Sequence, residues 1–227
     1  MLIFIDTETT GLEEKDRVCS IAIMGIEDST CKSIYELVND AKKIQSLASS
    51  INHITNEMLK NKPKLIDSQA YKYLQLHNKK STILIGHNIK FDLKMLRKSG
   101  FEFVGEVIDT LRVTKHLIPE CEQFSLQFLR YELKLYKKEK IKLEAHNALG
   151  DVEVVKNLYE YLLDIGTKEL FIELSSKKVL ITKFEFGKYS GRYIEEILMS
   201  DRGYIEWMLH NITDMDEDLR YSIEFYM

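Results

Sequence analysis

Acidic side chains occur at four places where a fold could bring carboxylates together. Asp6 and Glu8 follow an apolar segment, in the run DTETTGL. Their i, i+2 spacing on an extended chain places both side chains on the same face of a strand. Asp92 lies in GHNIKFDLKML after a second apolar segment, and Asp151 lies in HNALGD before a long amphipathic stretch. Apolar neighbours should hold all four acids near the core.

These four acids predict a binding site for divalent cations. Two like charges about 4 Å apart repel by roughly 4 kcal/mol at an effective dielectric of about 20. Bound cations offset that repulsion, and hard carboxylate ligands favour Mg²⁺ or Mn²⁺. Each acid taken singly has a simpler explanation, as a helix cap or a solvated loop residue. The prediction therefore depends on the four positions together.

Short polar connections separate the segments that are expected to position these acids. β-Branched and aromatic residues predict strands, the first three antiparallel, over residues 2–6, 18–27, 33–38, 82–87 and 106–109. Apolar residues at helical spacing predict helices over residues 45–59, 66–78, 89–99, 110–117, 124–131 and 146–164. Strands that first follow one another and then alternate with helices indicate an α/β sheet flanked by helices.

Composition narrows the classes of protein that this chain can represent. The chain has 227 residues, 44% of them hydrophobic and 30% charged, as in an ordinary globular protein. Its formal net charge of −4 argues against a protein that coats duplex DNA through basic charge alone. No apolar run approaches the roughly 18 residues of a membrane span, so no membrane partner is expected.

The cysteines and the N-terminal segment indicate where the protein works. Cys19, Cys31 and Cys121 show no C-x-x-C spacing, which is typical of reduced thiols in the cytosol. The apolar start of the chain meets Asp6 too soon for a signal peptide. We therefore expect a cytoplasmic protein.

The character of the sequence changes after residue 165. We expect a main domain over residues 1–165, a linking helix over 166–178 and a small, mainly helical accessory unit over 179–227. In that unit basic and aromatic side chains alternate between Phe186 and Tyr193, a pattern suited to single-stranded nucleic acid. An equal alternative is that these aromatic residues, together with Trp207, form the core of the unit.

Three short motifs resemble a known family of nucleases. DTETTGL, GHNIKFD and HNALGD, in this order, are similar to the three exonuclease motifs of the DEDDh 3′→5′ exonucleases. HITNEML, IDTL and FSLQFL match further positions of that family, so the resemblance covers residues 1–165. It implies a ribonuclease H-like fold, with a mixed five-stranded sheet flanked by helices. FEFGKYSGRYIEEI and DRGYIEWMLHNI resemble the C-terminal unit of a DNA exonuclease in this family.

The resemblance assigns roles to the acidic residues and to one histidine. Asp6, Glu8, Asp92 and Asp151 would bind two divalent cations, Mg²⁺ or Mn²⁺, on either side of the scissile phosphate. His146 stands five positions before Asp151 and would act as the general base. An unperturbed imidazole titrates at about pH 6.5, which suits the removal of a proton from water.

The same resemblance indicates residues that would contact the nucleic acid. The 3′-terminal nucleotide would be met by Thr9, Gly11 and Leu12, with backbone amides at the sugar and the leucine side chain against the base. The last bases of the strand would be held by His53, Ile54 and Asn88. For Leu12 and Ile54, packing in the core is an equal alternative.

We therefore expect a 3′→5′ exonuclease that releases nucleoside 5′-monophosphates from DNA. It would act on single strands, with duplex ends as a further substrate, in DNA repair. The principal alternative is a 3′→5′ exoribonuclease, because the cations would contact the phosphate and not the 2′ position. A binding module without activity is a further alternative, but all five predicted catalytic positions are present. The expected partner is the 3′ end of DNA, RNA stays open as a partner, and no protein partner is indicated.

Overall fold

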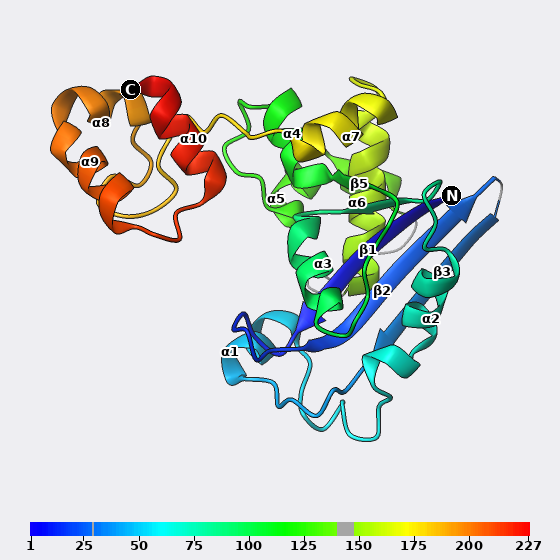
Figure 1. Cartoon of the computed structure of the whole chain (residues 1–227). Coiled ribbons are helices and arrows are strands. Elements are labelled where there is room, and N and C mark those ends of the chain that lie inside the picture. The colour runs from blue at the N-terminus through cyan, green and yellow to red at the C-terminus, as the bar shows by residue number, and fades with distance from the viewer. Residues whose placement is uncertain (29, 140–147) are drawn as a thin grey trace. The chain divides into compact units, whose positions relative to one another are not determined.

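The structure is a computed structural model that describes residues 1–28, 30–139 and 148–227 (Figure 1). The chain divides into two compact units, Met1–Ser175 and Ser176–Met227. Among the described residues, no helix is both long enough and apolar enough to cross a membrane.

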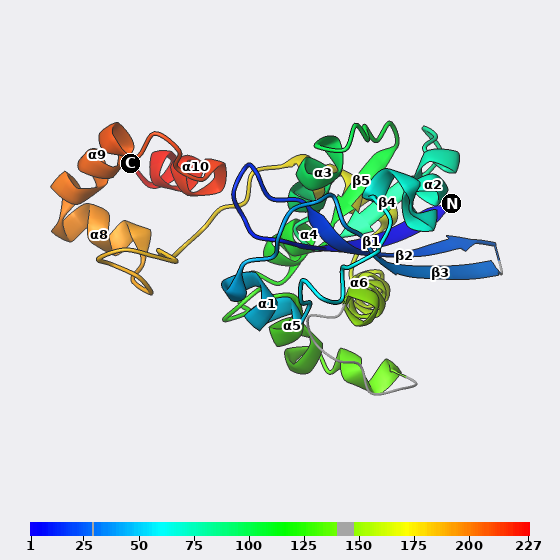
Figure 2. The same ribbon diagram turned by 90° about the horizontal axis from the view of Figure 1, so that it is seen from below.

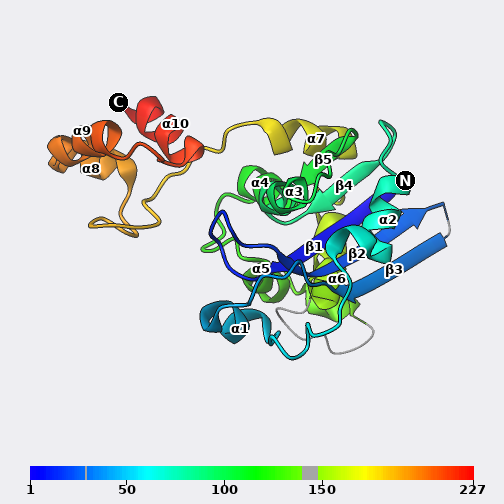
Figure 3. The same cartoon turned by 60° about the horizontal axis from the view of Figure 1, so that its bottom comes forward.

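A five-stranded mixed sheet forms the centre of the first unit. Its strands are β1 (Leu2–Thr9), β2 (Val18–Glu27), β3 (Thr30–Leu37), β4 (Ile83–Gly86) and β5 (Glu106–Asp109). Their order is β3-β2-β1-β4-β5, so β1 lies in the middle (Figure 3). β1 and β3 run antiparallel to β2, whereas β4 runs parallel to β1 and to β5. This is the predicted mixed sheet.

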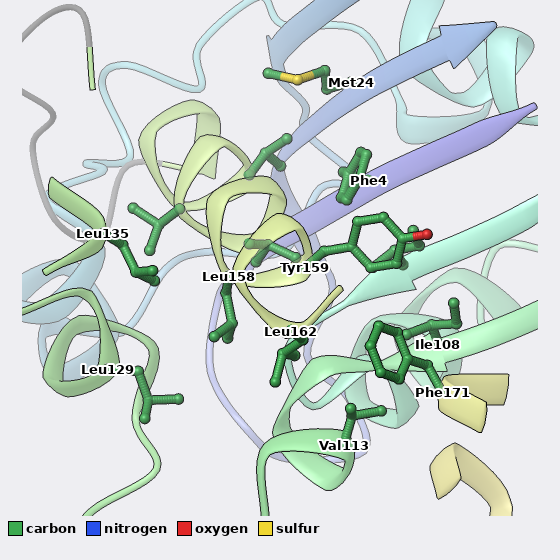
Figure 4. Packing of buried hydrophobic residues seen from close by; sticks show 14 of the residues in the cluster. Phe4, Met24, Ile108, Val113, Leu129, Leu135, Leu158, Tyr159, Leu162 and Phe171 are labelled. Atoms are coloured by element: carbon green, nitrogen blue, oxygen red, sulfur yellow. The ribbon is translucent and has the colours of Figure 1, made fainter. Parts of the chain in front are cut away.

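Side-chain alternation along β1 divides the core into two layers. Phe4 packs on the face covered by α6 (Ala148–Leu162), where its ring meets the edge of Tyr159 at a centroid distance of 5.6 Å (Figure 4). Ile3 and Ile5 pack on the opposite face, against α2 (Gln69–Leu76) and α3 (Ile89–Arg97). Figure 2 shows α6 and α2 on opposite sides of the sheet. β1 is thus buried on both faces, which makes it a rigid support for Asp6 and Glu8.

The other helices of this unit match the expected ranges with one difference. They are α1 (Ser46–Asn52), α4 (Thr110–Leu117), α5 (Leu126–Glu132) and α7 (Lys168–Ser176), with 3₁₀ turns η1 (Leu65–Asp67) and η2 (Leu135–Lys138). The helix expected over 45–59 ends at Asn52. His53 adopts a left-handed conformation with φ of 58°, and its N–H caps the helix on the carbonyl of Ser49.

The expected linking helix is part of the first unit instead. The α7 side chains of Phe171 and Leu174 belong to the core that α6 covers, and the Phe171 ring meets Tyr159 at 6.0 Å (Figure 4). Ser175 accepts a hydrogen bond of 2.8 Å from the N–H of Asp109. The apolar face of α7 thus packs in the main core, and the first unit ends at Ser175, ten residues after the expected end of the main domain at residue 165.

The second unit is mainly helical, as the sequence indicates. It contains α8 (Ile194–Ser200), α9 (Arg202–Asn211) and α10 (Glu217–Tyr226). Phe184, Ile194, Ile205 and Ile223 lie in a core of its own. Asp201 caps α9 by accepting a hydrogen bond from the N–H of Tyr204.

Candidate active site

The central strand supplies the first two carboxylates of the site. Asp6 and Glu8 project from β1 toward the face that α6 covers, and Thr7 between them projects toward the other face. The pairing of β1 with β2 shifts register between Glu8 and Thr9. Such a shift ends regular pairing and re-aims the chain, and it is common beside active sites.

Helix α6 brings a third carboxylate to the strand. Asp151 lies in the first turn of α6 and is 7% exposed. Val152 and Val155 on the same helix are fully buried against the sheet, which fixes the position of that turn. One oxygen each from Asp6, Glu8 and Asp151 lies within 4.8 Å of the others. Glu8 and Asp151 therefore meet at one point, although they are 143 positions apart in the sequence.

The electrostatics of this cluster disfavour its fully charged form. Burial, followed by the charges of Asp92, Asp151 and Glu8, raises the pKa of Asp6 well above its ordinary value. Burial, followed by the charges of Asp151 and Asp92, raises the pKa of Glu8 to about 7. A bound cation would lower both pKa values, because its positive charge stabilises the ionised carboxylates. The donor set therefore fits divalent cations.

Asp92 is not one of the three carboxylates whose oxygens lie within 4.8 Å of one another, but it is close to Asp6. It lies in the first turn of α3, is 4% exposed and accepts a hydrogen bond of 2.6 Å from the hydroxyl of Thr7. Burial raises the pKa of Asp92 to about 7, although the Thr7 hydroxyl acts in the opposite direction. Its charge contributes to the raised pKa of Asp6, so the two carboxylates are near neighbours.

Three polar residues that the sequence analysis did not single out act on the predicted ligands. Besides Thr7, the buried side chain of Asn52 lowers the pKa of Glu8, and its amide donates to the carbonyl of Thr9 at 3.2 Å. The amide of Gln127 donates to Asp151 Oδ1 at 2.6 Å. The sequence feature that could have pointed to such residues is a lone amide among apolar residues, as in LQFL around Gln127.

The loop after β1 carries the residues expected to meet a 3′ terminus. Thr9 donates to the carbonyl of Gly11 at 2.8 Å, and Thr10 donates to Asp16 at 2.8 Å. A Cβ at Gly11 would lie 2.5 Å from Asp16 Oδ2, so glycine is required while that carboxylate stays in place. Leu12 is 85% exposed at the tip of the loop. Core packing, the alternative for Leu12, is therefore wrong.

The second group of predicted substrate contacts divides by exposure. His53 and Asn88 are exposed, both with left-handed backbone conformations, and the N–H of Asn88 donates to Asp109 at 2.9 Å. Ile54 is 4% exposed and packs with Ile44 and Leu59. Packing in the core, the alternative for Ile54, therefore applies, because a side chain that is 4% exposed has too little free surface to contact a base.

The sequence predicts His146 as the general base. His146 lies outside the described residues, which resume at Ala148, where α6 begins.

Comparison with known proteins relates the whole chain to nucleases. The family model described as Exonuclease matches residues 3–159, and the model described as Exodeoxyribonuclease X-like C-terminal matches residues 184–213. Exodeoxyribonuclease 10 of Escherichia coli (strain K12) is 28% identical over 236 aligned residues, which cover 100% of this chain and 99% of the relative. The 3′-5′ exonuclease DinG of Bacillus subtilis (strain 168) is 29% identical over 170 residues, 71% of this chain and 17% of that protein.

Solved structures agree with these matches. The structure described as Exonuclease X in complex with 5′ overhanging duplex DNA aligns with a TM-score of 0.63 and 27% identity, over 78% of this chain and 100% of that chain. A structure of exonuclease I, 21% identical with a TM-score of 0.57 over 76% of this chain and 42% of that chain, shares the fold. Since the Exonuclease model spans more than half of the sequence, the chain belongs to the exonuclease family, in its ribonuclease H-like DEDDh group, and carries an exodeoxyribonuclease X-like C-terminal segment.

Proposed function

We propose that this protein is a metal-dependent 3′→5′ exodeoxyribonuclease that releases nucleoside 5′-monophosphates from DNA. One observation carries the proposal: Asp6, Glu8 and Asp151 gather their carboxylates in a chain that matches the Exonuclease model over residues 3–159. The similarity to exodeoxyribonuclease 10 along the whole chain favours DNA as the substrate.

The carboxylates would hold two divalent cations, Mg²⁺ or Mn²⁺, with Asp92 completing the set. Neighbouring carboxylates contribute to the raised pKa values of Asp6 and Glu8, so full ionisation is costly unless cations neutralise the cluster. When bound, the cations would supply positive charge and Lewis acidity at the scissile phosphate.

The side chains of the protein itself would orient the substrate and move one proton. His146 would accept the proton from the attacking water as the phosphodiester bond breaks. The exposed Leu12 would lie against the 3′-terminal base, while the backbone of Thr9 and Gly11 would meet its sugar. Exposed His53 and Asn88 would hold the adjoining nucleotides.

Digestion of end-labelled oligomers tests the direction, the metal requirement and the sugar preference together. A single-stranded DNA labelled at its 3′ end should release the label early as a mononucleotide, and the same DNA labelled at its 5′ end should give a shortening ladder. Both reactions should require Mg²⁺ or Mn²⁺ and stop with chelator. An RNA oligomer of the same sequence serves as the comparison, and faster cleavage of RNA would replace the proposal with an exoribonuclease.

Replacing the proposed base tests the chemistry. His146→Ala should lower the single-turnover rate by about 10²–10⁴-fold and leave DNA binding intact, because it removes the proton acceptor but no cation ligand. His210→Ala is the matched control, since His210 is exposed in the second unit and its ring bonds only to the carbonyl of Glu206 among the described contacts. Full activity in His146→Ala would overturn the assignment of the base.

A further inference from the structure

A line of hydrogen-bonded side chains leads from Asp151 into the protein. The amide of Gln127 on α5 donates to Asp151 Oδ1 at 2.6 Å, and its oxygen accepts from Arg130 Nη1 at 3.1 Å. Arg130 donates from Nε and Nη2 to the two carboxylate oxygens of Glu139, at 2.7 Å each. The side chains of Arg130 and Glu139 are 5% and 6% exposed, so this ion pair is buried.

The geometry of Arg130 fixes the orientation of the Gln127 amide. Glu139 occupies Nε and Nη2 of the guanidinium, which leaves Nη1 pointing at Gln127. A guanidinium only donates hydrogen bonds, so the amide must present its oxygen to Arg130 and its NH₂ to Asp151. The reverse orientation would place the amide oxygen against the carboxylate and leave Arg130 facing a second donor.

We propose that Gln127 is a positioning residue that holds the Asp151 carboxylate for cation binding, and that Arg130 and Glu139 act through it. The inference rests on the proposed function, because it concerns how the chain holds the cations of that reaction. A hydrogen bond to one oxygen restricts the rotation of the carboxylate, and loss of such outer contacts weakens metal binding or activity by about 10–100-fold in other proteins.

Stability alone gives a poor explanation for this arrangement. Burying an ion pair costs solvation that its attraction barely recovers, and apolar residues of similar volume often stabilise a protein as well. Leu129 on the same helix already anchors α5 in the core. The ion pair instead connects through the Gln127 amide to Asp151, a predicted cation ligand.

Direct measurement of Mn²⁺ binding tests the proposal without reference to activity. Gln127→Met keeps the length of the side chain and removes both hydrogen bonds. Calorimetric titration of the full-length protein should show Mn²⁺ binding weakened by about 10–100-fold. In DNA digestion the Mn²⁺ concentration for half-maximal rate should rise in parallel, while the KM for DNA should stay within about threefold. Gln75→Met, the same change at an exposed site on α2, should match the wild type.

A double-mutant cycle tests whether Arg130 acts through Gln127. Arg130→Lys keeps the charge beside Glu139 but loses the planar fork that orients the amide. It should weaken Mn²⁺ binding in the wild-type background and add little in the Gln127→Met background, because the coupled residues share one effect. Equal losses in both backgrounds would overturn the part assigned to Arg130.

Two outcomes decide the inference and keep it separate from the proposed function. Wild-type Mn²⁺ affinity in Gln127→Met, with an unchanged thermal midpoint, would overturn the positioning role. A wild-type protein that binds Mn²⁺ more tightly than Gln127→Met but cleaves neither DNA nor RNA would support the positioning role and overturn the exonuclease proposal.

Discussion

In the metal-free protein, the gathered carboxylates make the free energy of unfolding depend on pH. Burial first, and neighbouring charges second, raise the pKa of Glu8 to about 7, and burial raises that of Asp92 to the same value. Between about pH 4.5 and 7 the folded protein therefore holds protons that the unfolded chain has released. We predict that the free energy of unfolding of the metal-free protein falls as the pH rises through this window, by several kcal/mol at about 1.4 kcal/mol per pKa unit.

Urea denaturation in the presence of chelator, at about pH 5 and about pH 8, measures this fall. Added Mn²⁺ should stabilise the protein far more at the higher pH, because cation binding requires deprotonated carboxylates. A stability that is flat with pH in chelator, or a Mn²⁺ effect that is larger at low pH, would contradict the prediction.

Removing one carboxylate should separate stability from activity. Burial and three neighbouring acids raise the pKa of Asp6, so Asp6→Asn relieves repulsion in the metal-free protein. We predict that Asp6→Asn abolishes DNA cleavage yet raises the free energy of unfolding in chelator at about pH 8 by at least about 1 kcal/mol. Asp164→Asn, in an exposed turn, is the control and should change neither quantity. A destabilised Asp6→Asn protein would show that the repulsion is not the dominant effect.

The acids were predictable from the sequence because their motifs stand beside recognisable strands and helices. Their hydrogen-bond partners were not. Gln127 meets Asp151 only through the packing of α5 on α6, and Asn52 reaches Glu8 only because the end of α1 lies against the end of β1. A contact between residues that are distant in sequence leaves no spacing rule to follow, so an amide in an apolar helix carries no sign of its partner.

At the scale of elements, the loop between β1 and β2 is shaped by its own contacts and by α3. Asp16 accepts hydrogen bonds from the hydroxyl of Thr10 and the N–H of Glu13, at 2.8 Å each. Lys98, at the end of α3, donates to the carbonyl of Glu14 at 2.8 Å, and its side chain is 10% exposed. The helix that carries Asp92 therefore also supports the loop that exposes Leu12.

An ordered loop with an exposed apolar tip predicts a contact surface. Leu12→Ala should leave the free energy of unfolding within about 0.5 kcal/mol, because Leu12 is 85% exposed. It should lower kcat/KM for DNA by about tenfold, which corresponds to about 1.4 kcal/mol of lost apolar contact with the terminal base. Leu76→Ala, on α2 and 68% exposed, is the matched control. Equal kcat/KM values for the two variants would exclude a contact between Leu12 and substrate.

Element types were more predictable than element ends and partners. The expected range 110–117 matches α4 because Asp109 caps that helix and the apolar spacing is regular. The helix expected over 45–59 stops at Asn52, since a left-handed histidine ends it without any glycine to mark the place. The place of α7 in the main core was missed, because Phe171 and Leu174 show that the helix is amphipathic but not which surface it covers.

At the scale of the whole molecule, the chain builds two separate cores. Phe171 and Leu174 are the last members of the larger core, and Phe184 is the first buried member of the smaller one. In the smaller unit the aromatic residues have divided roles. Tyr189 packs against the buried residues of the smaller core, whereas Phe186, Tyr193 and Trp207 are about half exposed, at 49%, 54% and 53%. The core alternative for these residues therefore applies only in part.

The exposed aromatic residues lie among basic ones. Lys188 Nζ lies 4.6 Å from the ring centroid of Tyr189, and Lys183 Nζ lies 4.7 Å from that of Tyr193. The Trp207 ring stacks on Tyr204 with an interplanar angle of 26°. Exposed rings beside amines suit the bases and phosphates of a single strand, although Lys188 is also paired with Asp201.

Separate cores predict that the second unit adjusts substrate use and does not supply the chemistry. A protein that ends at Ser175 retains Asp6, Glu8, Asp92, His146 and Asp151, so it should fold and release mononucleotides. Its KM for single-stranded DNA should rise by about tenfold or more, because base stacking on aromatic side chains contributes about 1–3 kcal/mol per base. Trp207→Ala in the full chain should reproduce part of that rise without changing kcat. Steady-state rates on single-stranded and 5′-overhanging DNA measure both effects, and identical behaviour of the shortened and full-length proteins on every substrate would show that the second unit has no part in binding.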